Sequence, residues 1–117
     1  MPDERRAFVQ EAELELGPGM DPTAVGGAVT TALCGHWEHE GACRWPHNNE
    51  IHVAGGRATF RTLFIATSRD ELEVRERIVR SLRAGPGWAL HRTEPRPASP
   101  AEQPLALRLA AAPSAPR

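Results

Sequence analysis

The chain has 117 residues, 40% hydrophobic and 25% charged, which is enough for one ordinary soluble domain and too few for two. Its 14 basic and 15 acidic residues nearly cancel, which argues against a general polyanion binder. All the basic residues are arginines and tyrosine is absent, so catalysis through a lysine Schiff base or a tyrosine is excluded. No apolar run approaches the roughly 20 residues of a membrane span. The first residues lead into an acidic segment instead of the apolar core of a signal peptide, so we expect a cytoplasmic protein.

The first part of the chain predicts a strand, a helix and a loop. Apolar and acidic residues alternate over residues 11–16, which is typical of a half-buried strand. Asp21 and Pro22 resemble an N-cap followed by a proline at the first helical position, and apolar residues at helical spacing continue to Leu33. Residues 36–49 show no clear period and predict a structured loop.

The second part predicts two strands, a helix and a last strand. Residues 51–53 indicate a short strand, and a turn at Gly55 and Gly56 leads into a strongly β-prone strand over residues 58–67. Ser68 and Glu71 fit a capping box at the start of a helix. The apolar stripe of that helix is Leu72, Val74, Ile78, Val79 and Leu82. Residues 88–93 predict the last strand.

The order β-α-β-β-α-β predicts an α+β protein with the ferredoxin-like arrangement, an antiparallel sheet with two helices on one face and a long Cys/His-rich loop between the first helix and the second strand. We expect residues 1–93 to form one domain with a metal-binding loop at residues 34–52. Residues 94–117 are rich in proline and alanine and predict a disordered tail. Within it, only residues 105–109 are a candidate for local order, as a strand or a helical turn that docks on the domain.

Cysteines and histidines are concentrated between Cys34 and His52. Thiolate and imidazole groups suit zinc, copper or iron better than magnesium or calcium. The spacing, C-x-H-x2-H-x3-C-x3-H-x4-H, does not match the separated ligand pairs of common zinc fingers. We predict a Zn²⁺ site with the candidate ligands Cys34, His36, His39, Cys43 and His47. His52 is the weakest further candidate because it lies in or beside a predicted strand.

Two other interpretations of the cysteines stay open. Cys34 and Cys43 could form a disulfide, or they could be buried and inert while the histidines are ordinary loop residues. Trp37 and Trp45 flank the cluster, either as core residues that shield it or as the walls of a pocket for a small ligand. The arginines of the second helix are expected to lie on a solvated face, in pairs with glutamates four residues away: Arg75, Arg77, Arg80 and Arg83.

The function expected from these patterns is that of a small metal-binding protein whose zinc pins the long loop. The alternative is a small metalloenzyme with an open zinc site, in which Glu38 or Glu40 is the general base acting on a small-molecule substrate. A homodimer is expected by analogy with other domains of this arrangement. A nucleic-acid partner is disfavoured because Phe60 and Phe64 lack basic companions.

Overall fold

The computed structural model describes residues 4–34 and 44–111. The elements in chain order are β1 (Arg5–Leu16), α1 (Thr23–Cys34), β2 (His47–Ala54), β3 (Arg57–Thr67), α2 (Glu71–Ala84), β4 (Trp88–Arg96), the short 3-10 helix η1 (Pro100–Glu102) and α3 (Gln103–Ala111). The predicted α+β class is therefore confirmed.

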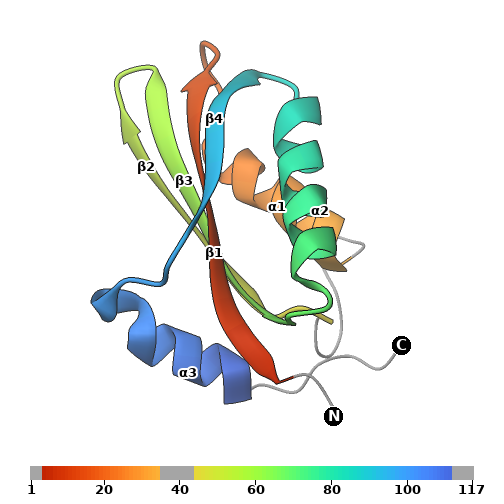
Figure 1. Ribbon diagram of the computed structural model, residues 1–117. Helices are drawn as coiled ribbons and strands as arrows, with labels where there is room; N and C mark the ends of the chain where they lie inside the picture. Colours follow the sequence, from red (N-terminus) through yellow and green to blue (C-terminus); the bar gives the residue numbers. More distant parts are fainter. Residues whose placement is uncertain (1–3, 35–43, 112–117) are drawn as a thin grey trace.

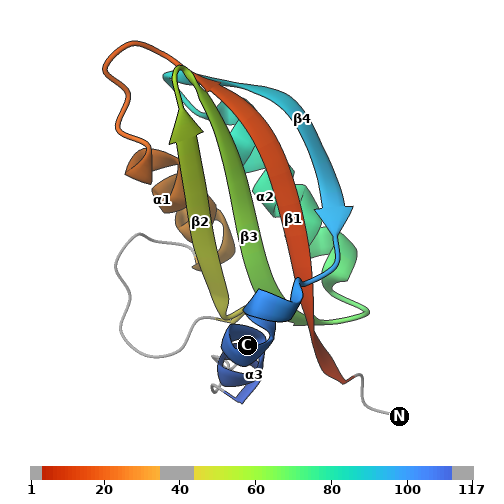
Figure 2. The same cartoon turned by 90° about the vertical axis from the view of Figure 1, so that its left-hand side faces the viewer.

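The four strands form one sheet in the order β2-β3-β1-β4, and each neighbouring pair is antiparallel. β2 and β4 are thus the two edges of the sheet, as Figure 2 shows. Both α1 and α2 cover one face, whereas α3 crosses one end of the opposite face (Figure 1). We call these the helix-covered face and the open face.

The main core lies between the sheet and the two helices of the helix-covered face. Phe60 and Phe64 of β3 are almost completely buried there. Alternate residues of a strand point to opposite faces, and apolar residues four apart on a helix share one side, so the two patterns meet in one layer. α2 contributes Val74, Ile78 and Leu82 to this layer.

Several predicted boundaries are wrong, beginning with β1, which starts at Arg5 instead of Glu11. β2 begins at His47 instead of Ile51, because the backbone of residues that were predicted as loop continues to pair with β3. α2 is capped by Asp70 instead of Ser68, and no side-chain hydrogen bond closes the cap. The reason is that the Asp70 carboxylate accepts a hydrogen bond from Trp45 instead, while its backbone N–H donates to the carbonyl of Thr67.

The predicted disordered tail contains regular structure within the described residues. β4 continues to Arg96, and α3 packs Ala106 against Val9 and Leu63 of the open face. This agrees with the local order considered for residues 105–109 and differs from a tail that is disordered from residue 94. The physical reason is that the open face is apolar at this end. The few leucines of the tail pack on this apolar surface, and the burial of both surfaces from water stabilises α3 there.

An ion pair fastens this C-terminal segment to the sheet. Arg61 of β3 donates from Nε and Nη2 to the two carboxylate oxygens of Glu102, each at 2.8 Å, and from Nη1 to Glu11 at 2.7 Å. Hydrogen bonding to Arg61 lowers the pKa of Glu102 to about 2, and burial opposes this shift only in part. Because the contact is bidentate, it fixes orientation as well as distance.

Candidate functional site

The structure describes only part of the predicted Cys/His site. Cys34 is the last residue of α1, and His47 and His52 both belong to β2. The remaining predicted site residues lie outside the described residues: His36, Trp37, Glu38, His39, Glu40 and Cys43.

Cys34 is disulfide-bonded in this structure. The sequence has one other cysteine, Cys43, which lies outside the described residues. A disulfide was one of the alternatives to the metal site, and a disulfide sulfur is not the thiolate that binds zinc. A zinc site that uses Cys34 would therefore first require reduction.

His47 is held by hydrogen bonds at both ring nitrogens. Its Nδ1 lies 3.0 Å from the carbonyl oxygen of Trp45, which can only accept, so Nδ1 carries a proton. Its Nε2 lies 3.0 Å from the hydroxyl of Thr30 on α1. In the neutral ring the hydroxyl donates to Nε2, and the lone pair that a metal would need is engaged. In this arrangement His47 joins α1 to β2.

Asn49 extends the same polar network between α1 and the sheet. Its Nδ2 donates to the carbonyl of Gly26 at 3.0 Å and to the Thr30 hydroxyl at 3.1 Å. The buried hydroxyl of Thr62 donates to Asn49 Oδ1 at 3.0 Å. Because buried polar groups are stable only when they are paired, this network explains why polar residues occur inside the α1–β2 contact.

Trp45 is a core residue, which is one of the two roles expected for it. It is 3% exposed and belongs to the main core. The guanidinium groups of Arg44 and Arg77 lie over its ring at 4.4 and 5.1 Å from the ring centroid. These contacts bury the indole and stabilise the junction of β2 with α2, so its ring is not available as an open ligand wall.

His52 lies on the opposite face of β2 from His47, because an odd number of positions separates them. Its Nε2 is 2.6 Å from Glu50 Oε1, and both side chains are exposed. Over residues 4–34 and 44–111 no three His, Cys, Asp or Glu side chains are arranged to hold a metal ion. The zinc site stays a prediction, because three of its five candidate ligands, His36, His39 and Cys43, lie outside these ranges.

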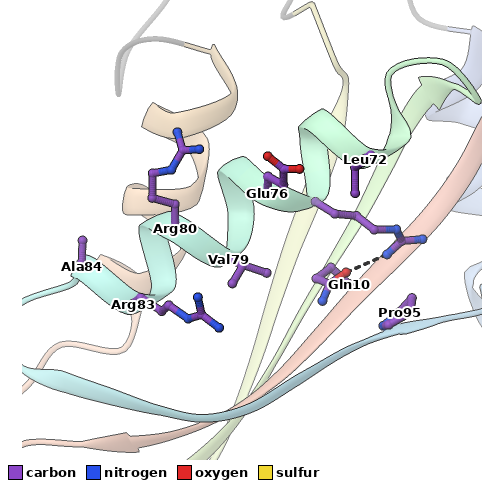
Figure 3. Close-up of a pocket in the computed structure, with 9 residues that line it drawn as sticks. Gln10, Leu72, Glu76, Val79, Arg80, Arg83, Ala84 and Pro95 are labelled. Carbon is purple, nitrogen blue, oxygen red and sulfur yellow. Dashed lines mark hydrogen bonds between the residues drawn. The ribbon is translucent and has the colours of Figure 1, made fainter.

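The structure contains a groove that the sequence did not predict. It lies between α2 and the strands β1 and β4 and has a volume of about 590 Å³ (Figure 3). This volume falls within the range of small-molecule sites. The lining residues are Gln10, Leu72, Arg75, Glu76, Val79, Arg80, Arg83, Ala84 and Pro95. Leu72, Val79 and Pro95 give the groove an apolar floor, and Leu72 is 68% exposed.

Arg75 is the least exposed of the groove arginines, and its hydrogen bonds are internal. Its Nη1 donates to the carbonyl oxygen of Val9 at 2.8 Å and to Oε1 of Gln10 at 2.7 Å. Its Nε donates to Glu71 at 2.8 Å. Arg75 therefore links α2 to β1 and makes this wall of the groove rigid.

Arg80 and Arg83 differ from the arginines earlier in α2. Arg77 pairs with Glu73 one turn earlier, at 2.9 Å, and Arg75 pairs with Glu71 in the same way. Arg80 and Arg83 have no hydrogen-bond or ion-pair partner in the part of the chain that the structure describes. Figure 3 shows Arg83 extending on the β4 side of the helix, and Arg80 extending on the other side. An unpaired guanidinium beside an apolar floor favours an anionic ligand.

The sequence pattern contained a weak signal for this site. The prediction of paired arginines on α2 is confirmed for Arg75 and Arg77. Four residues before Arg83 stands Val79 instead of a glutamate, so the helical pairing pattern stops there. Leu72 was predicted to belong to the apolar stripe of α2. The side of α2 that faces the core is formed by Val74, Ile78 and Leu82, which are four positions apart, and Leu72 lies outside this side and is exposed.

In the described residues, no helix is both long enough and apolar enough to span a membrane. Comparison of the chain with protein-family models, with curated proteins and with solved structures found no match.

Proposed function

We propose that this protein binds a small amphipathic organic anion, a carboxylate on an apolar chain, in the groove between α2 and β4. The observation that carries the proposal is the Arg83 guanidinium, which has no partner among the described residues and lies beside an apolar floor. None of the groove residues named above is a serine, threonine, cysteine or histidine. This lining supports binding more than covalent catalysis.

The ligand would be held at two places. Leu72, Val79 and Pro95 would cover its apolar chain, which removes hydrocarbon surface from water. Arg83 would receive the carboxylate through two parallel N–H donors, and Arg80 would add positive potential from the other side of the helix. Because Arg75 is already bonded to β1, its wall of the groove would need little rearrangement when the ligand binds.

The test compares two ligands with the same ten-carbon chain, one with an anionic carboxylate and the other with a neutral hydroxyl as its head group. Decanoate and decanol would each be titrated as displacers of the fluorescent anion anilinonaphthalene sulfonate. Arg83→Gln should weaken decanoate binding about tenfold, because one charge-assisted hydrogen-bonded contact is lost, and leave decanol unchanged. Leu72→Asn should weaken both ligands.

Arg57→Gln is the matched control, since Arg57 of β3 also has no partner among the described residues and lies outside the groove. It should bind both ligands as the unmodified protein does. Equal decanoate binding by Arg83→Gln and Arg57→Gln would contradict the proposal.

The arrangement that carries this groove is proposed to be ferredoxin-like. The strand order β2-β3-β1-β4 and the location of α1 and α2 on one face support it. α3 is an addition to the two helices of that arrangement.

A second candidate is zinc binding by the segment 34–52, favoured by the density of cysteine and histidine there. It requires reduced thiols, which fits a cytoplasmic location. The reduced protein, loaded with zinc and then desalted, should retain one ion per chain by elemental analysis, and His39→Ala should retain less.

An open zinc site with Glu38 or Glu40 as the general base would make the protein a metalloenzyme. Reduced protein without bound zinc would refute both forms.

A further inference from the structure

The two edges of the sheet differ in their protection against pairing with another strand. β4 carries Pro95 and Pro97 at and beyond its end, and its register with β1 shifts between Glu13 and Leu14. β2 pairs with β3 over its full length without a register shift and contains no proline. Prolines and bulges are the usual means of blocking an edge, so β4 is protected and β2 is not.

The turn between β2 and β3 determines which backbone groups of β2 face outward. Ala54 and Arg57 pair across Gly55 and Gly56, and the φ of 65° at Gly55 fits the first position of a type II′ turn. The two residues that flank such a turn bond to each other, and the bonded positions then alternate along an antiparallel pair. Asn49, Ile51 and Val53 therefore direct their N–H and C=O groups away from β3.

We infer that two copies of this chain pair through β2, in antiparallel orientation about a two-fold axis at Ile51. In this register the outward-facing groups of Asn49 meet those of Val53 of the second copy, so each backbone donor meets an acceptor. No other strand pairs with β2 among residues 4–34 and 44–111.

The side chains agree with the same register. Glu50 of one copy stands directly opposite His52 of the other, so an acid faces a base on both sides of the axis. Within one copy these two side chains contact each other at 2.6 Å, and at 51% and 75% exposure they stay accessible to the same groups of the second copy. Val53, which is 47% exposed, stands opposite Asn49 of the second copy and diagonal to its Ile51, so part of its apolar surface is covered. The charge pattern is self-complementary, which identifies a second copy as the occupant.

This pairing is independent of the proposed groove, because the groove lies beside β4 at the other edge. Two copies joined at β2 would leave both grooves accessible. Failure of one proposal therefore leaves the other intact.

Sedimentation of the full chain over a range of concentrations tests the pairing. The unmodified protein should form dimers. Val53→Pro removes an outward N–H that bonds to nothing within the sheet, and it should raise the dimer dissociation constant about 30-fold, because two backbone hydrogen bonds are lost per dimer. Val53→Ala is the matched control: it keeps the N–H and should dimerise much more tightly than Val53→Pro.

Amide hydrogen exchange locates the interface. In the dimer the amides of Ile51 and Val53 should be protected, and in the monomeric Val53→Pro variant the Ile51 amide should exchange rapidly while the amides of Glu50 and His52 stay protected by β3. A dimer with a rapidly exchanging Ile51 amide would overturn the inference.

Charge substitution tests the register itself. His52→Glu sets like charges opposite each other and should weaken the dimer, whereas the double substitution Glu50→Lys with His52→Glu restores opposite charges and should recover it. A protein that stays monomeric at all concentrations, or a double variant as weak as the single one, would also refute the pairing.

Discussion

The two faces of the sheet are held by different kinds of interaction. On the helix-covered face, apolar side chains from β1 and β3 pack against α1 and α2 in one continuous core. On the open face, charged side chains of neighbouring strands pair across the sheet, as in the contacts of Arg92 with Glu13 and of His91 with Glu15. Only one end of the open face is apolar, and α3 covers it.

This difference predicts that the faces contribute unequally to stability. Burial of apolar surface is the dominant favourable term in folding, whereas exposed ion pairs contribute little. The covered end of the open face lies between these cases, because a small apolar cluster is held by the mostly buried ion pairs of Arg61. We therefore expect α3 to detach before the main core unfolds.

The largest effect is expected from the helix-covered face. Phe64→Ala removes a fully buried ring from the centre of the core and should lower the free energy of unfolding by about 3–5 kcal/mol. Urea denaturation followed by circular dichroism measures this. If Phe64→Ala lowered the free energy of unfolding by less than a substitution in an exposed ion pair does, the helix-covered face would not be the main source of stability.

Arg61→Met should have an intermediate effect. It leaves Glu102 without its cationic partner and Glu11 with Arg96 alone, so we expect a loss of about 1–3 kcal/mol, together with faster amide exchange in α3 than in β3. Arg92→Met is the matched control, because the Arg92–Glu13 pair is exposed and contacts no helix. Equal rates of amide exchange in α3 of the two variants would show that Arg61 does not hold α3 on the sheet.

The attachment of α3 should also depend on pH. The pKa of Glu102 is lowered from 4.5 to about 2, chiefly by its hydrogen bonds to Arg61. The unfolded chain takes up the proton first as the pH falls, so the contribution of Glu102 is complete above pH 4.5 and is lost between there and about pH 2. Amide exchange in α3 should accelerate over this range. In Glu102→Gln the acceleration should be weaker, and an unchanged pH profile would show that another group is responsible.

The smallest effect is expected from the exposed pairs of the open face. His91 lies 2.9 Å from Glu15, and both side chains are substantially exposed. His91→Ala should therefore change the free energy of unfolding by less than about 0.5 kcal/mol in urea denaturation. If His91→Ala lowered the free energy of unfolding as much as Arg61→Met does, the exposed ion pairs of the open face would stabilise it as strongly as α3 does.

Local sequence patterns predicted the order of the elements because each pattern acts within one element. The alternation in β1 and the core stripe of α2 specify a strand and a helix whatever lies beside them. The Asp21 cap is equally local, since its side chain accepts from the backbone N–H of Thr23. Boundaries failed where a distant residue intervened, as when Trp45 engaged the Asp70 carboxylate.

The candidate sites show the same limit. The sequence indicated the Cys/His segment because its donors are neighbours along the chain, yet His47 is engaged by Thr30, 17 positions away. The groove was not predicted because it joins α2 to β4 and to Gln10 of β1, which is more than 60 positions away in the sequence.

The amino-acid sequence by itself determined the α+β class, the alternation of strands and helices and the surplus of apolar residues on one side of α2. Periodicity and turn residues encode these features within a few positions. Only the tertiary structure decided that α3 docks on the open face, that Arg83 stands without an acidic neighbour among the described residues, and that β2 is left as an unprotected edge. These features depend on which surfaces meet, and the free energy of such contacts comes from residues that are far apart along the chain.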